Sequence, residues 1–122
     1  MARRDLTGAV DFAYLENYAG GDLAVVEEVL ALFREQASLW IRLLEPGAPA
    51  QGWRDAVHTL KGSARGIGAN ALADACEAVE GAAANAEIPG LERVRDDLDA
   101  VLSDIAAYVH ELALRSLKSP PA

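Results

Sequence analysis

The sequence predicts an all-α protein, folded as an antiparallel, up-and-down four-helix bundle with a short extra helix at its N-terminus. Ala and Leu dominate the 122 residues and β-branched residues are few, a composition that favours helices over strands. Apolar residues recur every three or four positions, and short breaks separate the helical stretches. Because the breaks are short, helices that follow one another in sequence should also be neighbours in space.

The first two predicted helices are separated by a pair of glycines. A short helix near residues 11–18 has Phe12 and Leu15 as its apolar face and should pack across one end of the bundle. Gly20 and Gly21 end it, and Asp22 is a good N-cap for a helix over about 23–44. One face of this second helix carries Val26, Leu30, Phe33, Ala37, Trp40 and Leu44.

The third and fourth helices form a predicted hairpin. Pro46, Gly47 and Pro49 stop the second helix, and the third runs over about 53–67. Asn70 can cap a fourth helix over about 71–84. The inward face of this fourth helix carries Leu72, Cys76 and Val79.

The fifth helix is the longest, and Pro89 and Gly90 are interpreted as the break before it. It should run over about 91–117, with the inward residues Val94, Leu98, Val101, Ile105, Val109 and Leu112. We therefore expect one domain over residues 1–117 and a disordered tail over residues 118–122.

Composition excludes several classes of function. The formal net charge of −8 repels a phosphate backbone, so nucleic acid is not an expected partner. The first residues lack the apolar run of a signal peptide, and no stretch is apolar enough to span a bilayer, so we expect a cytoplasmic protein with no membrane partner. Cys76 is the only cysteine, which excludes a disulfide within the chain and a cysteine-based zinc site. It is predicted to be a small core residue.

The third helix carries the candidate chemistry. On a helical wheel its apolar residues define one arc, and His58 lies on the opposite, water-facing side. Lys61 and Arg65 lie on the same exposed stripe and can place positive charge beside a phosphoryl group on the histidine. Gly62, one turn after His58, leaves room for another protein's reactive group, which would offset the cost of roughly 1 kcal/mol that glycine carries inside a helix.

Simpler interpretations compete at each of these positions. A surface histidine is usually only a solvated polar side chain, and His110 is interpreted in that way. For Arg65, a role in solubility outweighs a role in a site. Gly62 could serve close helix packing, although the wheel turns it towards water. The spacing alone makes a phosphate site plausible and leaves these alternatives open.

Hairpin geometry adds a possible partner for the histidine. If the turn between the third and fourth helices centres near Ala69, His58 lies eleven residues before it and Glu80 eleven after, and Glu77 is level with Lys61. Glu80 could then accept a hydrogen bond from one ring nitrogen, which would fix the tautomer and leave the other nitrogen free to attack phosphorus. A solvated carboxylate is the equal alternative.

The run AVHTLKGSARGIGANALADACEAVE, over residues 56–80, resembles the histidine-containing phosphotransfer (HPt) domain family. The matching pattern is His58-Thr59-Leu60-Lys61-Gly62-Ser63-Ala64, then Gly68-Ala69, then Leu72, Cys76 and Glu80. The stretch before it, from about Val10 and including Phe33, also looks like the start of such domains, so the likeness covers most of the chain.

The resemblance implies a four-helix bundle with His58 as the phosphoacceptor. It also implies that Lys61 helps to hold the phosphoryl group, that Gly62 gives access and that Glu80 orients the imidazole. Arg65 departs from the small residue more usual at its position, and either adds charge to the site or points to water.

The implied function is a phosphocarrier without kinase activity of its own. The implied partners are receiver domains of response regulators, with a hybrid sensor histidine kinase upstream, and the chain should be a monomer. No cofactor is expected on this chain, which has no nucleotide-binding motif, and the receiver should supply Mg²⁺ and the acyl phosphate. Docking should use the exposed stripe around His58 and possible apolar neighbours, of which Phe12 and Leu15 are candidates with core packing as their alternative.

Two other functions compete with the phosphocarrier. One is a non-catalytic helical module that docks on a kinase or receiver and inhibits it; the presence of His58, Lys61 and Gly62 together argues against this. The other is a dimeric bundle domain of a sensor kinase, which is not required because one chain already offers four bundle helices.

Overall fold

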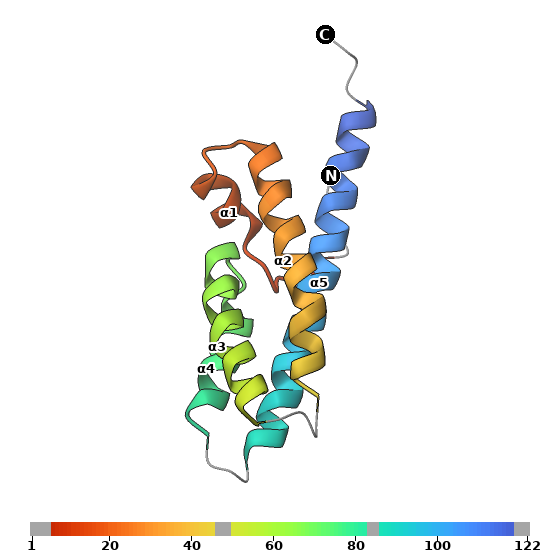
Figure 1. Ribbon diagram of the computed structural model, residues 1–122. Coiled ribbons are helices and arrows are strands. Elements are labelled where there is room, and N and C mark those ends of the chain that lie inside the picture. Colours follow the sequence, from red (N-terminus) through yellow and green to blue (C-terminus); the bar gives the residue numbers. More distant parts are fainter. Residues whose placement is uncertain (1–5, 46–49, 83–85, 119–122) are drawn as a thin grey trace.

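The computed structural model describes residues 6–45, 50–82 and 86–118 (Figure 1). These residues form five helices: α1 (Phe12–Tyr18), α2 (Leu23–Leu43), α3 (Ala50–Ile67), α4 (Asn70–Glu80) and α5 (Glu87–Lys118). Helices α2 to α5 run alternately up and down, and α1 lies at the end of the bundle where α2 begins (Figure 1). The predicted all-α, antiparallel four-helix bundle with a short N-terminal helix is therefore confirmed.

The core follows the predicted apolar faces. The predicted inward residues of α2 and α4 are all buried, and so are Phe12 and Leu15 of α1. The apolar arc of α3 is buried as well, and it consists of Trp53, Val57, Leu60, Ala64 and Ile67. In α5 the prediction fails at one position, because Val109 is half-buried and its neighbour Tyr108 is buried instead. The Tyr108 ring stacks on Phe12, with 4.1 Å between ring centroids, so a contact from a distant part of the chain decides which side chain turns inward.

The ends of the first helices follow local hydrogen-bonding chemistry. The Asp22 side chain accepts hydrogen bonds from the backbone N–H groups of Ala24 and Val25, at 3.1 and 3.3 Å, which confirms it as the N-cap of α2. The prediction for Asn70 is wrong, because Asn70 is the first residue of α4 and Ala69 precedes it without a capping side chain.

Gly68 forms the turn between α3 and α4. Gly68 has a φ of +82°, a conformation that favours glycine. Its carbonyl accepts a hydrogen bond from Asp11 N–H at 3.0 Å, and a Cβ atom on it would lie 2.9 Å from the Asp11 carbonyl oxygen. The turn that ends α3 is thus held against the segment that leads into α1.

Three predicted boundaries are wrong. α3 begins at Ala50 rather than near Trp53, α4 ends at Glu80 rather than near Ala84, and α5 begins at Glu87, before the expected break. Pro89 lies in the first turn of α5, where its missing N–H has no intrahelical partner to lose. Of the predicted tail, Lys118 is the last residue of α5, so the tail prediction is wrong at that position. Residues 119–122 lie outside the described residues, as do the break residues Pro46, Gly47 and Pro49.

The N-terminal segment is tied to α5 by a buried carboxylate. Asp104 is fully buried and accepts hydrogen bonds from Thr7 N–H at 2.8 Å, the Thr7 hydroxyl at 3.1 Å and Ala9 N–H at 3.0 Å. This contact fixes the chain ahead of α1 on the side of the bundle formed by α5.

Candidate functional site

His58 lies on the water-facing side of α3, as its place on the helical wheel predicts. The side chain of His58 is 74% exposed, whereas Val57 and Leu60 on either side of it are fully buried. The amphipathic pattern of α3 therefore directs the imidazole outward by burying the opposite face.

One nitrogen of the His58 ring is held by the neighbouring helix. Glu80, the last residue of α4, places Oε2 3.1 Å from His58 Nδ1. Within the described residues no hydrogen bond reaches the other ring nitrogen, Nε2. The contact predicted from the hairpin geometry is thus present, and it leaves one nitrogen of an exposed ring open.

The second oxygen of Glu80 binds the cation predicted beside the histidine. Glu80 Oε1 lies 2.6 Å from Lys61 Nζ. The hydrogen bond from Lys61, more than that from His58, lowers the pKa of Glu80 below its usual value, against a smaller opposing effect of burial. Glu80 is therefore ionised at neutral pH, and an ionised carboxylate can only accept a hydrogen bond. This favours the tautomer with the proton on Nδ1.

Lys61 and Glu77, predicted to lie level with each other, do not form a pair. Glu77 instead pairs with Arg65, at 3.2 Å, one turn further along α3. The reason is that helical side chains lean towards the N-terminus of their own helix. In an antiparallel pair the side chains of the two helices lean in opposite directions along the bundle. The long side chains of Lys61 and Arg65 therefore reach acids of α4 further from the turn than an equal count suggests, whereas the shorter side chain of His58 meets Glu80 at an equal count.

The exposed stripe of α3 carries three cations, and each one faces an acid of a later helix. Arg54 pairs with Glu87 of α5 at 3.3 Å, Lys61 with Glu80, and Arg65 with Glu77. These three ion pairs connect the exposed stripe of α3 to α4 and α5. Arg65 thus lies on the stripe with His58, but its guanidinium contacts Glu77 rather than the histidine or Glu80.

Gly62 lies in open space one turn after the histidine. A Cβ atom added there would meet no atom within 4 Å. Close packing of helices therefore does not explain this glycine, in contrast to Gly90, where an added Cβ would lie 2.7 Å from a Val79 methyl carbon. The surface beside His58 is open as predicted.

For Phe12 and Leu15, the candidates for docking, the alternative of core packing is the correct one. Phe12 and Leu15 are only 3% and 2% exposed, because α1 packs them into the core. Other large apolar side chains are exposed: Leu32 and Leu39 of α2, at 57% and 56% exposed, and Ile88 in the first turn of α5, at 60% exposed.

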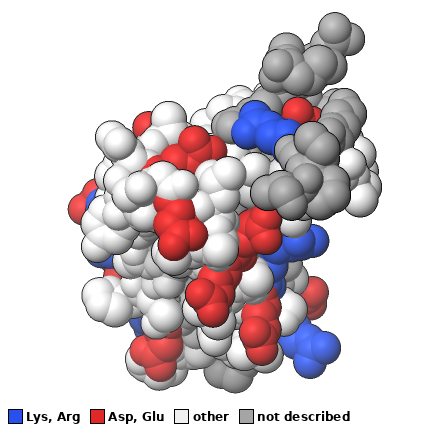
Figure 2. Space-filling model, turned by 90° about the horizontal axis from the view of Figure 1, so that it is seen from above, with Lys and Arg blue, Asp and Glu red and all other residues white. Residues whose placement is uncertain are grey.

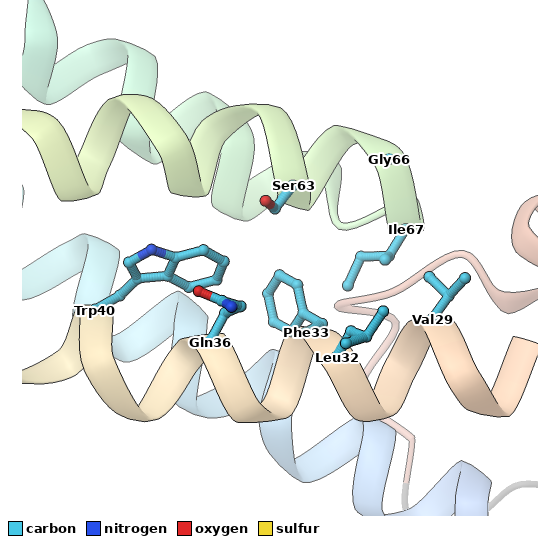
Figure 3. Close-up of a pocket in the computed structure, with 8 residues that line it drawn as sticks. All are labelled: Val29, Leu32, Phe33, Gln36, Trp40, Ser63, Gly66 and Ile67. Carbon is cyan, nitrogen blue, oxygen red and sulfur yellow. The ribbon is translucent and has the colours of Figure 1, made fainter.

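A groove of about 260 Å³ lies between α2 and α3 (Figure 3). The rings of Phe33 and Trp40 lie between the two helices, and Ser63 and Ile67 face them from α3 (Figure 3). The full lining is Val29, Leu32, Phe33, Gln36, Trp40, Ser63, Gly66 and Ile67. We refer to this feature as the α2–α3 groove.

The sequence contains a signal for this exposed face. A second stripe of α2 precedes the core stripe by one residue, with the same alternation of three- and four-residue steps. Its members are Val25, Val29, Leu32, Gln36, Leu39 and Leu43. One apolar stripe is enough for a helix to pack on the core. A second, adjacent stripe therefore predicts another surface of α2 that a partner covers.

Other features of the molecule agree with the composition. Burial raises the pKa of the Cys76 thiol to about 12, so this predicted core residue is not a nucleophile at neutral pH. Figure 2 shows acidic side chains over much of the end of the molecule that carries α1, as a formal net charge of −8 suggests. None of the helices in the described ranges is both long and apolar enough to cross a membrane.

Residues 22–108 match a family described as the Hpt domain. The chain belongs to the Hpt domain family. The solved structures include a similar one, the histidine phosphotransferase ShpA from Caulobacter crescentus, which is 62% identical in sequence and superposes with a TM-score of 0.78. The match covers 91% of this chain and 100% of that one. Among curated proteins no match is found. The family match spans α2, α3, α4 and most of α5, and so includes the helices that carry His58, Lys61 and Glu80.

Proposed function

We propose that this Hpt domain is a phosphorelay intermediate that accepts a phosphoryl group on His58 from the aspartyl phosphate of one receiver domain and passes it to the aspartate of another. The observation that carries the proposal is the exposed His58 ring, whose Nδ1 is bound to an ionised carboxylate while Nε2 is open. Transfer is reversible, because the same geometry serves both directions.

Nε2 is the proposed nucleophile. With the proton on Nδ1, the lone pair of the neutral imidazole lies on Nε2, which is the nitrogen that reaches furthest from the helix. Glu80 holds the plane of the ring through Nδ1, so that Nε2 has one direction of approach to phosphorus. Glu80 is in this account a positioning residue.

Lys61 and Gly62 serve the transferred group. The Lys61 ammonium has three donors, and the contact with Glu80 leaves others for phosphoryl oxygens. Gly62 leaves the surface beside the ring open to the partner. Arg65, bound to Glu77, adds positive charge further along the same stripe, and we assign it a secondary role in attracting the acidic partner site.

The docking face of the proposal is the α2–α3 groove together with the exposed stripe of α2. Gly62 and Gly66 follow His58 at four-residue steps on α3, and Gly66 lines the groove, so small residues connect the histidine to an apolar surface. We propose that a receiver domain covers this face and supplies Mg²⁺ and the acyl phosphate, with a hybrid sensor histidine kinase as the upstream source of phosphate.

A transfer assay tests the proposal. A receiver domain carrying labelled aspartyl phosphate is mixed with the wild-type chain, with His58→Ala and with His110→Ala, the matched control at the other histidine. We expect acid-labile, alkali-stable label on the wild type and on His110→Ala, and none on His58→Ala. Binding of a receiver without any label on the chain would contradict the proposal and favour the inhibitory module.

A further inference from the structure

We propose that Glu80 keeps a proton on Nδ1 of His58 while the phosphoryl group is bound to Nε2, so that the group arrives and departs without any proton transfer. This inference rests on the proposed function of His58. It adds to that function a second role for Glu80, in the phosphorylated state, beyond orienting the ring before attack.

The two contacts of Glu80 support this role. Oε2 lies 3.1 Å from Nδ1 of His58, and Oε1 lies 2.6 Å from the Lys61 ammonium, so the carboxylate is held on both oxygens. The side chains of Glu80 and Lys61 are 27% and 21% exposed, far less than the ring they support. The carboxylate therefore keeps its place when the exposed ring gains a phosphoryl group.

Among the described charged groups near the ring, Glu80 is the one bound to it, while Asp55 keeps its negative charge one turn earlier on α3. On α3, Arg54 and Arg65 are bound to Glu87 and Glu77, and Asp55 accepts a hydrogen bond from Gln51 at 2.9 Å. Lys61 is bound to Glu80 itself. Across the part of the chain that the structure describes, Glu80 supplies the one carboxylate in contact with the imidazole. A positive ring would thus be stabilised chiefly by Glu80.

The bonds and charges balance without a proton moving. The lone pair of Nε2 attacks phosphorus, the Nε2–P bond forms, and the P–O bond to the receiver breaks with its electron pair leaving on the aspartate carboxylate. The ring keeps the proton on Nδ1 and becomes a cation against Glu80. In the onward step a second carboxylate attacks phosphorus, the Nε2–P bond breaks, and its electron pair returns to Nε2 to give neutral imidazole. Without the Nδ1 proton, the leaving group would be an imidazolate anion, which leaves poorly.

The inference predicts how long the phosphorylated chain lives at each pH. His58 is phosphorylated with phosphoramidate, a small-molecule donor, in the wild type, Glu80→Gln and Glu77→Gln, and the loss of phosphohistidine is followed from pH 5 to pH 9. Glu77→Gln is the matched control, because it removes one negative charge from the same helix one turn before Glu80, at a side chain that binds Arg65 rather than the ring. The ¹⁵N chemical shift of Nδ1 is measured on the same samples.

In Glu80→Gln we expect the decay of phosphohistidine to slow at a pH about one unit lower than in the wild type. One unit is the lower end of the range by which an opposite charge in contact shifts a pKa. Phosphohistidine at pH 8 should then survive several times longer, about 3- to 10-fold, with Nδ1 deprotonated, whereas Glu77→Gln should match the wild type. The wild type alone gives a second measurement: its Nδ1 should stay protonated to a higher pH than that of free Nε2-phosphohistidine.

Equal decay profiles for Glu80→Gln and the wild type would overturn the inference and leave the proposed function standing. So would an Nδ1 of wild-type phosphohistidine that loses its proton at the same pH as the free amino acid. Failure of His58 to accept phosphate from any receiver would instead refute the proposed function, and the two failures are therefore distinguishable.

Discussion

At the scale of single residues, the chemistry depends on two oxygens of one carboxylate. Glu80 contacts His58 through Oε2 and Lys61 through Oε1, so it links the nucleophile to the cation that is proposed to hold the phosphoryl group. A lone histidine on a helix surface would be an ordinary solvated side chain. The contact from α4 places an ionised carboxylate 3.1 Å from Nδ1 of this ring, which favours the tautomer with the proton on Nδ1.

Substitution of Gly62 tests access to the ring. Gly62→Ala should leave transfer within about twofold and the fold intact, because a Cβ atom meets nothing there and alanine favours the helix by roughly 1 kcal/mol. Gly62→Gln should slow transfer from a receiver by about 100-fold, since a long side chain keeps the reacting groups apart. Rates of label transfer and circular dichroism measure the two effects. Equal rates for Gly62→Gln and Gly62→Ala would show that access at this position does not matter.

At the scale of the elements, α2 has two apolar stripes that serve different surfaces. The buried stripe faces the core, and two of its rings, Phe33 and Trp40, also line the α2–α3 groove. The stripe one residue earlier adds Val29, Leu32 and Gln36 to that lining, and it carries Leu32 and Leu39, each more than half exposed. Burying such a stripe against a partner helix or surface would gain the free energy of removing apolar area from water.

Leu32→Asp is the test of this face. Because Leu32 is 57% exposed, the substitution should lower the free energy of unfolding by less than about 1 kcal/mol. It should nevertheless reduce kcat/KM for transfer from a receiver by about tenfold or more, as the loss of a central apolar contact does in other interfaces. Leu117→Asp, at an 83% exposed position near the end of α5, is the control and should leave transfer unchanged. Equal loss in both variants would place docking elsewhere.

The sequence predicts the elements better than their ends. Helical periodicity identifies every buried face of α2, α3 and α4, and it turns His58 outward. The limits at Asn70 and Pro89 are wrong because both residues are compatible with the first turn of a helix as well as with its cap or break. Counting from the turn finds the contact of His58 with Glu80. It misses the pairs of Lys61 with Glu80 and of Arg65 with Glu77, because these depend on how far long side chains lean along their helix.

At the scale of the whole molecule, contacts between distant parts of the chain escape prediction. Asp104 has no partner that periodicity can identify, yet it binds Thr7 and Ala9 across almost the full length of the sequence. The stacking of Phe12 on Tyr108 is a second such contact, because periodicity places Val109 rather than Tyr108 on the inward face of α5.

Removal of the Asp104 carboxylate measures the value of this contact. Asp104→Ala removes a buried carboxylate that accepts three hydrogen bonds and should lower the free energy of unfolding by about 2–4 kcal/mol. Chemical denaturation measures the loss. Asp99→Ala, at an exposed position on the same helix, is the control and should change stability by less than about 0.5 kcal/mol. A loss of stability no larger than that of the control would mean that the N-terminal segment does not depend on Asp104.

Nuclear magnetic resonance of the phosphorylated, ¹⁵N-labelled chain tests the central claim most directly. Phosphate transferred from a receiver domain should give a ³¹P–¹⁵N coupling to Nε2 of His58, with Nδ1 still bound to Glu80. Coupling to Nδ1 of His58, or to a nitrogen of His110, would contradict the account.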